Sequence, residues 1–247
     1  MISTPQTTGL LQPEFPPLLK GMPLGGAGNP FAAAIKAAED EASLGDGVTP
    51  GLVHYAQRDD LLRAAVTFAP EVPLARAIGV LWAVQLGFAD ALGALAPPEV
   101  AVQFDWPDGL RLNGARCGGF RACASTHDPA EEPDWLVIGL EVALRSQGDG
   151  GATPDQTTLS DEGCAEITPP DLLESWSRHM LVWVHSYLHE GLAPLHQSYR
   201  GKVIGIGTDI TAPASGTFTG LDECGGMILK QGETTRTLPL TQILEQA

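Results

Sequence analysis

The side chains best suited to act on a small ligand lie in one short stretch, which runs Asp-Trp-Pro-Asp-Gly-Leu-Arg-Leu-Asn-Gly-Ala-Arg from Asp105 to Arg116. An arginine supplies a fixed positive charge and a planar group that can grip a carboxylate or a phosphate through two hydrogen bonds. Because a guanidinium stays protonated at neutral pH, it does not shuttle protons. Arg116 is therefore either an anion-binding residue or the ion-pair partner of Asp105 or Asp108.

Cysteine is the nucleophile to consider. The chain contains four cysteines, at positions 117, 123, 164 and 224. Because they show neither C-x-x-C spacing nor the density of a disulfide scaffold, we expect reduced and mostly buried thiols. Cys123, on a central strand near the expected pocket, and Cys164 are the two candidate nucleophiles, although an unreactive buried thiol is the commoner outcome.

Histidines occur at positions 179, 185, 189 and 196, in and just after an expected helix. His185 and His189 lie one helical turn apart, so both could face one metal ion. No carboxylate or cysteine completes a recognisable ligand set with them. We therefore expect no metal site.

Two turns and three strands must position Asp108 and Arg116. Residues 106–109, Trp-Pro-Asp-Gly, have the composition of a tight turn, and Asn113-Gly114 is a strong hairpin signal. Apolar runs of strand length follow at residues 110–112, 115–124 and 135–144. The stretch therefore predicts a three-stranded antiparallel unit with the Trp-Pro turn at its mouth.

A pocket is expected between the Trp106 turn and the strand from residue 116 to 123. Because side chains alternate along a strand, Gly118 and Phe120 should share the face of Arg116, while Cys117 and Gly119 should point away. Glycine at position 118 would leave room beside the arginine. Such a site would suit an acyl chain or a carboxylate.

The same stretch resembles the catalytic core of the biotin and lipoate protein ligases. In that family a K-W-P-N-D-L turn leads through a hairpin to a G-R-K-x-x-G-I strand and then to a V-I-G-I-G-I-N-V strand. Residues 104–120 keep this spacing without a gap, and residues 135–142 supply the second strand. The resemblance implies a catalytic pair, Arg116 and Asp108. The substrate-binding positions that it implies are Asp105, Trp106, Gly118, Gly119, Phe120 and Cys123.

This sequence departs from the family pattern at positions where the family's chemistry needs particular side chains. Asp105 stands where the family has a lysine, Asp108-Gly109 replaces Asn-Asp, and Arg116 replaces the catalytic lysine. Lysine occurs only at positions 20, 36, 202 and 230. The family's glycine- and arginine-rich nucleotide loop also has no counterpart, because residues 57–78 contain no glycine for close backbone approach to phosphate.

Length and charge bound the remaining choices. A chain of 247 residues with 43% hydrophobic residues can bury a substantial core. A formal charge of −16 argues against nucleic acid as a partner, because phosphate backbones are bound through clustered Lys and Arg. We expect no apolar run to reach the roughly 20 residues that span a bilayer, and no secretory signal is visible, which predicts a cytoplasmic protein without membrane contact.

The predicted fold class is α+β, with a mixed or antiparallel sheet and packed helices as in the class II synthetase-like core of these ligases. Helices are expected at residues 30–44, 75–95 and 171–190, and further strands at 52–56, 64–69 and 100–104. Residues 1–20 form an N-terminal arm and residues 21–198 the core. Residues 199–247, with strands at 200–207, 216–222, 226–229 and 235–240, resemble the C-terminal SH3-like barrel of biotin protein ligases.

Three functions remain open. The chain is a ligase-like enzyme that binds or transfers a biotin, lipoate or octanoate-type acyl group to a biotinyl or lipoyl carrier domain, or a cysteine-dependent octanoyl or lipoyl transferase. The third alternative is a non-catalytic ligand-binding or regulatory relative. No tightly bound cofactor is expected, and a homodimer is compatible with each. No helix-turn-helix segment precedes the core, so the resemblance implies no repressor role.

Overall fold

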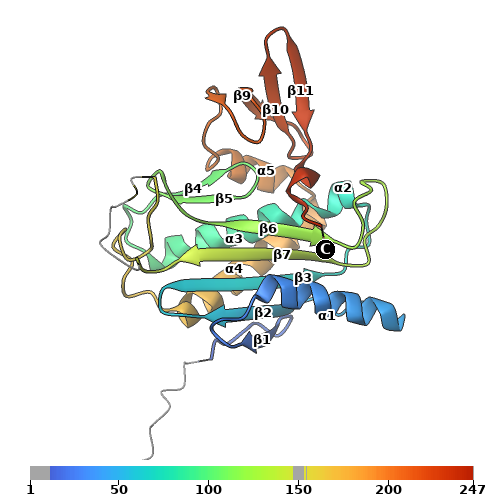
Figure 1. Cartoon of the computed structure of the whole chain (residues 1–247), viewed down its shortest axis with the longest axis vertical. Coiled ribbons are helices and arrows are strands. Elements are labelled where there is room, and N and C mark those ends of the chain that lie inside the picture. Colours follow the sequence, from blue (N-terminus) through green and yellow to red (C-terminus); the bar gives the residue numbers. More distant parts are fainter. Residues whose placement is uncertain (1–11, 147–152, 154, 247) are drawn as a thin grey trace, which may run out of the picture.

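The computed structural model describes residues 12–146, 153 and 155–246, and its main body is a seven-stranded sheet with helices on both faces (Figure 1). The strand order is β1-β2-β3-β7-β6-β5-β4, and all neighbours are antiparallel except the parallel pair β1 and β2. The strands are β1 (Lys20–Leu24), β2 (Leu52–Gln57), β3 (Leu61–Phe68), β4 (Val102–Asp105), β5 (Gly109–Leu112), β6 (Ala115–Ala124) and β7 (Leu136–Ala143). The predicted α+β class with a mixed sheet is confirmed.

The helices of the main body are α1 (Pro30–Leu44), α2 (Leu74–Ala77), α3 (Val80–Leu95), α4 (Pro169–Glu190) and α5 (Ala193–Arg200). Local signals set their ends. The side chain of Asn29 accepts a hydrogen bond from the Ala32 amide at the start of α1, and Gly45 ends that helix with a left-handed φ of 82°. Thr168 and Asp171 form a capping box at the start of α4.

The expected helix at residues 75–95 is in fact two helices that break at Ile78-Gly79. Packing explains the glycine, because a Cβ on residue 79 would lie 2.9 Å from the Tyr187 hydroxyl on α4. The segment Leu74–Leu95 is also, by length and apolar composition, sufficient to cross a membrane, which corrects the expectation that no run is long enough. It is a core segment, since 78% of its most apolar window is buried.

The two faces of the main sheet are covered unequally. Helices α3 and α4 pack behind it, where alternate residues of β7, such as Leu136, Ile138 and Leu140, enter the large core. On the front face, α1 covers only part of the sheet, and its Phe31 lies on Gly139, where a Cβ would come within 2.7 Å of the ring. Beyond α1, the front face of β6 is therefore available for contacts with other segments or with a ligand.

The C-terminal unit is a four-stranded antiparallel sheet in the order β11-β10-β9-β8. Its elements are β8 (Asp209–Ile210), β9 (Gly216–Leu221), β10 (Met227–Gln231), β11 (Thr234–Leu238) and the 3-10 turn η1 (Leu240–Ile243). A small C-terminal β unit is therefore present, as predicted. The strand expected at residues 200–207 is wrong, because α5 extends to Arg200 and Gly205 and Gly207 take positive φ angles of 86° in the turns that follow.

Two segments link the C-terminal unit to the main body. Val203 forms a bridge beside Phe104 on β4, with Phe104 donating its amide to the Lys202 carbonyl at 3.0 Å. Tyr199 is fully buried and stacks between Trp82 and Phe104. Residues 20–24 form β1 against β2, so the main sheet begins where the N-terminal arm was expected to end; residues 1–11 of that arm lie outside the described part.

Candidate functional site

The turn between β4 and β5 is held from two sides. Gln85 of α3, fully buried, donates from its side-chain amide to the Pro107 carbonyl at 2.8 Å. From the sheet, the Phe120 amide donates to the Asp108 carbonyl at 2.8 Å. These two hydrogen bonds fix the Asp108 main chain relative to β6. The predicted Trp-Pro turn thus leads into the predicted hairpin.

Trp106 contacts the C-terminal unit. Its ring is buried, and its indole N–H donates to the Gly225 carbonyl at 2.9 Å. Trp106 also lines the second of two cavities described below. Substrate binding by Trp106 stays a prediction, and its hydrogen bond to Gly225 gives the residue a structural role.

Arg116 lies beside Gly119, because the β5–β6 ladder contains an irregularity. Arg111 pairs with Arg116, whereas Leu110 pairs with Gly118, so Cys117 is an extra residue on β6. A Cβ on residue 119 would lie 3.5 Å from Nη2 of Arg116. The expectation that Gly119 points away from the arginine is wrong, since strict alternation does not hold across a bulge.

Gly118 has a different role from the one expected. A Cβ at this position would come within 2.1 Å of the Glu141 carbonyl oxygen on β7. Glycine therefore allows β6 and β7 to approach each other. Room beside the arginine comes from Gly119.

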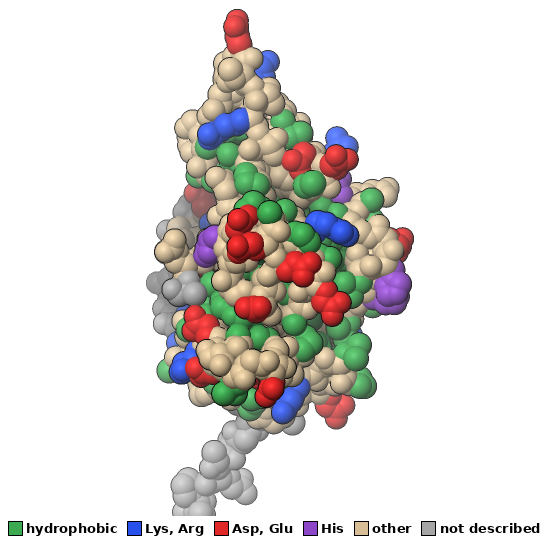
Figure 2. Space-filling view, turned by 90° about the vertical axis from the view of Figure 1, so that its right-hand side faces the viewer, with side chains coloured by type: hydrophobic (Ala, Val, Ile, Leu, Met, Phe, Trp, Pro, Cys, Tyr) green, Lys and Arg blue, Asp and Glu red, His purple; other side chains and the backbone are tan. Residues whose placement is uncertain are grey.

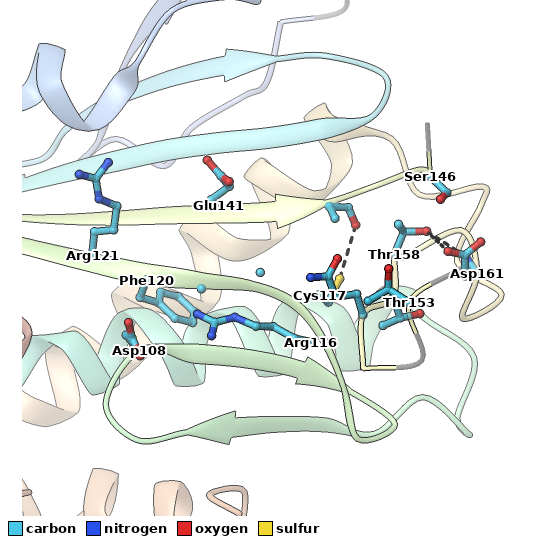
Figure 3. Close-up of a pocket in the computed structure, with 15 residues that line it drawn as sticks. Asp108, Arg116, Cys117, Phe120, Arg121, Glu141, Ser146, Thr153, Thr158 and Asp161 are labelled. Atoms are coloured by element: carbon cyan, nitrogen blue, oxygen red, sulfur yellow. Dashed lines mark hydrogen bonds between the residues drawn. The ribbon is translucent and has the colours of Figure 1, made fainter. Parts of the chain in front are cut away.

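Two cavities meet at Arg116, and Figure 3 shows the residues that line the first of them. The first, of about 630 Å³, lies over β6 and β7 and reaches the segment around Thr158 and Asp161. The second, of about 890 Å³, lies between the Trp106 turn and the C-terminal unit. The residues that line both are Asp108, Arg116, Phe120 and Arg121. The predicted pocket beside the Trp106 turn is thus present.

The Asp108 carboxyl and the Arg116 guanidinium carry unlike charge at this junction. Figure 3 shows the Arg116 side chain running along β6 toward Phe120 and Asp108. Burial raises the pKa of Asp108 above its usual range, and the positive charge of Arg116 opposes that rise. Within residues 12–146, 153 and 155–246, Arg116 has no ion-pair partner closer than the 4.0 Å that defines a salt bridge.

Asp105 is paired with an arginine that the sequence did not single out. Its carboxylate accepts from Nε of Arg111 at 2.6 Å, and Arg111 also donates to the Gly114 carbonyl at 2.6 Å. The alternative in which Arg116 pairs with Asp105 is therefore wrong. Asp105 lines the second cavity as part of this ion pair.

A row of alternating charges crosses the front of the sheet. Arg63 on β3 contacts Glu141 on β7 at 2.6 Å, and Arg121 on β6 makes two hydrogen bonds to Glu245, at 2.7 and 2.5 Å. The hydrogen bonding to Glu245 is the largest cause of the raised pKa of Arg121, and the charge of Glu141 adds to it. The guanidinium of Arg121 also lies 4.3 Å above the Phe31 ring.

None of the candidate cysteines is set up as a nucleophile. Cys123 lines neither cavity and donates its thiol to the Glu245 carbonyl at 3.3 Å. Cys117 lines the first cavity, but burial raises the pKa of its thiol to about 12. Burial also raises the pKa values of Cys123 and Cys164. A raised pKa keeps these thiols protonated at neutral pH, and a protonated thiol is a poor nucleophile.

The described residues contain no group of three or more His, Cys, Asp or Glu side chains that could hold a metal ion. His185 and His189 do face each other, with ring centroids 4.0 Å apart. They lie on the exposed end of α4.

Sequence reasoning did not place Arg121, Glu141 or Glu245 at the site. Arg121 could have been found, because it lies two residues after Gly119 on the same strand and so faces the same side. Glu141 lies opposite Gly119 across the β6–β7 ladder. Glu245 had no local signal, since its position depends on how the C-terminal unit folds back onto β6.

Known proteins provide two kinds of comparison. Residues 15–201 match the biotin/lipoate A/B protein ligase family, and residues 208–246 match a domain of unknown function, DUF4444. The biotin--[acetyl-CoA-carboxylase] ligase of Paracoccus denitrificans is 26% identical over 195 residues, which cover 72% of this chain and 80% of that protein.

Among solved structures, a biotin protein ligase-like protein of unknown function from Silicibacter sp. TM1040 is 49% identical. The match has a TM-score of 0.86 and covers 95% of this chain and all of that one. A variant of Aquifex aeolicus biotin protein ligase in complex with biotin is 14% identical, with a TM-score of 0.64 over 90% of this chain and 96% of that one. At that identity the likeness concerns the fold alone.

Proposed function

Because the chain belongs to the biotin/lipoate A/B protein ligase family, we propose that it binds a small acyl ligand of the biotin, lipoate or octanoate type and does not activate it with ATP. The carboxylate of the ligand is held by Arg116. One observation carries this proposal: a cation without an ion-pair partner among the described residues stands where two cavities meet, with Gly119 leaving space beside it.

The chemistry of the junction favours a carboxylate. A guanidinium makes two parallel hydrogen bonds to a carboxylate, and both groups are planar. The Asp108 carboxyl lines the same junction, and burial raises its pKa above its usual range. Arg116 thus offers the ligand a fixed positive charge beside this carboxyl.

The second cavity supports a place for the acyl body. Its apolar residues come from the turn, from β6 and from the C-terminal unit. They are Trp106, Pro107, Phe120, Ile204, Ile210, Ala212, Pro213, Phe218, Met227 and Ile243. An acyl chain that extends from Arg116 into this cavity would bury its carbon atoms there, and each buried CH2 contributes about 0.8 kcal/mol.

The absence of ATP chemistry is proposed from the β2–β3 connection. Only Arg58, Asp59 and Asp60 separate the two strands, and Arg58 is bound to Asp60 through two hydrogen bonds, at 2.8 and 2.7 Å. A segment of this length without glycine offers no phosphate cradle. No lysine lines either cavity among the described residues.

The proposal also includes a protein partner. The Paracoccus relative is named for acetyl-CoA-carboxylase, so a biotinyl or lipoyl carrier domain is the macromolecule to test for binding.

We also propose the division into a core of residues 21–198 and a C-terminal unit of residues 199–247. It is supported by the two family matches, which end at residue 201 and begin at residue 208.

The test is a binding panel with purified protein. Biotin, lipoate and octanoate are titrated by calorimetry into wild type, Arg116→Ala and Arg236→Ala, an exposed arginine on β11 that serves as the control. The proposal expects one of the three acids to bind to wild type and to the control, with binding lost in Arg116→Ala. Absence of binding by all three, or binding unaffected by Arg116→Ala, would overturn it.

A further inference from the structure

The geometry points to Arg121 as a second ligand-binding cation, whose present partner, the Glu245 carboxylate, gives way to a second anionic group on the ligand. The ligand class that this predicts is an acyl chain with an anionic group at each end. The inference rests on the proposed function, because it adds a contact to the same pair of cavities.

Arg121 and Arg116 lie on either side of Gly119. Nη2 of Arg116 is 3.5 Å from the point that a Cβ on residue 119 would occupy. Arg121 is two residues further along β6, so its Cα lies about 6.6 Å from that of Gly119 on the same face. Both arginines line both cavities, and the Arg121 side chain is 47% exposed. A ligand in the space that the two cavities share is therefore lined by both arginines.

Glu245 reaches Arg121 because residues 244–246 lie along β6. Strand β5 pairs with β6 only as far as Gly119, which leaves the same edge free beyond that point. Leu244 bridges to Ala122 there, and the Glu245 amide donates to the Ala122 carbonyl at 2.8 Å. Figure 1 shows this end of the chain beside β6. The carboxylate thus comes from a segment that lies against the cavity wall.

Exchange of this carboxylate for another preserves the environment of Arg121. A ligand carboxylate would make the same two charge-assisted hydrogen bonds, and the guanidinium could keep its place above the Phe31 ring. The pair is partly exposed on both sides, at 47% for Arg121 and 41% for Glu245. Ion pairs with such exposure contribute little to stability, so the exchange costs little.

The surrounding charges favour a second anion only where Glu245 is displaced. Besides Glu245, which lines the second cavity, the acids that line the two cavities are Asp108, Glu141 and Asp161 in the first and Asp105, Asp108 and Asp209 in the second. Asp105 is paired with Arg111, and Asp209 accepts a hydrogen bond from Thr217 at 2.6 Å. Asp161 accepts a hydrogen bond from Thr158 at 2.9 Å, and Glu141 is paired with Arg63. Glu245 is therefore the acid whose departure exposes a cation toward the ligand.

The test compares two acids with eight carbon atoms, octanoate with one carboxylate and suberate with two. Affinities are measured by calorimetry for wild type, Glu245→Gln, Arg121→Gln, Arg116→Ala and Glu233→Gln. Glu233 lies in the exposed β10–β11 turn, and its substitution controls for the change in net charge. Thermal unfolding of each variant shows that it is folded.

In Glu245→Gln we expect suberate to bind about threefold to fivefold more tightly than to wild type, with octanoate changed by less than about twofold. Arg121→Gln should remove the preference for suberate, and Glu233→Gln should behave as wild type. A suberate-to-octanoate ratio that is the same in wild type, Glu245→Gln and Arg121→Gln would overturn the role of Arg121. If that ratio is constant while Arg116→Ala still abolishes octanoate binding, the proposed function stands alone; if neither acid binds, both fail.

Discussion

Nη2 of Arg116 lies 3.5 Å from the point that a Cβ on Gly119 would occupy, so residue 119 decides how much space the arginine has. The same Cβ would lie 2.9 Å from the Asp108 carbonyl oxygen, which is closer than real Cβ contacts come. Because residue 119 has no Cβ, the Asp108 turn and the Arg116 side chain can both lie close to the same side of β6.

Substitution of Gly119 by alanine is predicted to weaken ligand binding by about tenfold and to lower the free energy of unfolding by about 1–3 kcal/mol, because the Asp108 turn must move away from the added methyl group. Calorimetry and urea unfolding measure the two effects. The matched control is Gly220→Ala on β9, where a Cβ meets nothing within 4 Å. Equal behaviour of the two variants would contradict the close approach at residue 119.

The pH dependence of stability should report on Asp108. Its folded-state pKa is raised by burial, so the unfolded chain loses this proton at a lower pH than the folded protein does. The resulting penalty is absent below the unfolded value of about 3.9 and grows as pH rises through the folded pKa. Asp108→Asn should therefore gain stability relative to wild type as pH rises from about 4 to 7, as followed by urea unfolding. A difference that stays constant across this range would argue against the raised pKa.

Thiol reactivity should separate Cys224 from the other three cysteines. Cys224 is exposed, whereas Cys117, Cys123 and Cys164 are buried and their pKa values are raised by burial. A chromogenic disulfide reagent should therefore modify one thiol quickly in the native protein and the remaining three only after unfolding. The variant Cys224→Ser identifies the fast phase. Rapid modification that persists in this variant would show a second reactive thiol and would support the alternative of a cysteine-dependent transferase.

ATP should neither raise the thermal midpoint nor support biotin-dependent pyrophosphate exchange. The reason is the three-residue β2–β3 connection, in which Arg58 is already bound to Asp60. A ligand that binds the native state raises the midpoint in proportion to the logarithm of its concentration over Kd. Robust exchange by the purified protein would mean that another segment binds the nucleotide.

Much of the fold could be predicted because its signals are local. Asn29 and Gly45 mark both ends of α1, and the Asn113-Gly114 turn defines the start of β6, so the bounds of both elements agree with those expected. The acidic composition likewise predicts that acidic side chains dominate the charged surface, and Figure 2 shows a face on which acidic side chains outnumber basic ones.

The parts that could not be predicted depend on contacts between distant segments. The bulge at Cys117 changes which glycine lies beside Arg116, and it follows from pairing with β5 rather than from the sequence of β6. Asp105 was one of two acids considered as a partner of Arg116, but it pairs with Arg111, which the same hairpin brings to it. Glu245 joins the site only when residues 244–246 pair with β6.

The account depends most directly on whether Arg116 binds a carboxylate. Calorimetric titration of octanoate and lipoate into wild type and Arg116→Ala, with thermal unfolding of both proteins, decides this. We predict that the variant loses at least about tenfold in affinity, about 1.4 kcal/mol, with little change in its melting temperature, because Arg116 has no ion-pair partner among the described residues. An unchanged affinity together with a lower melting temperature would reduce Arg116 to a structural residue and contradict the proposed site.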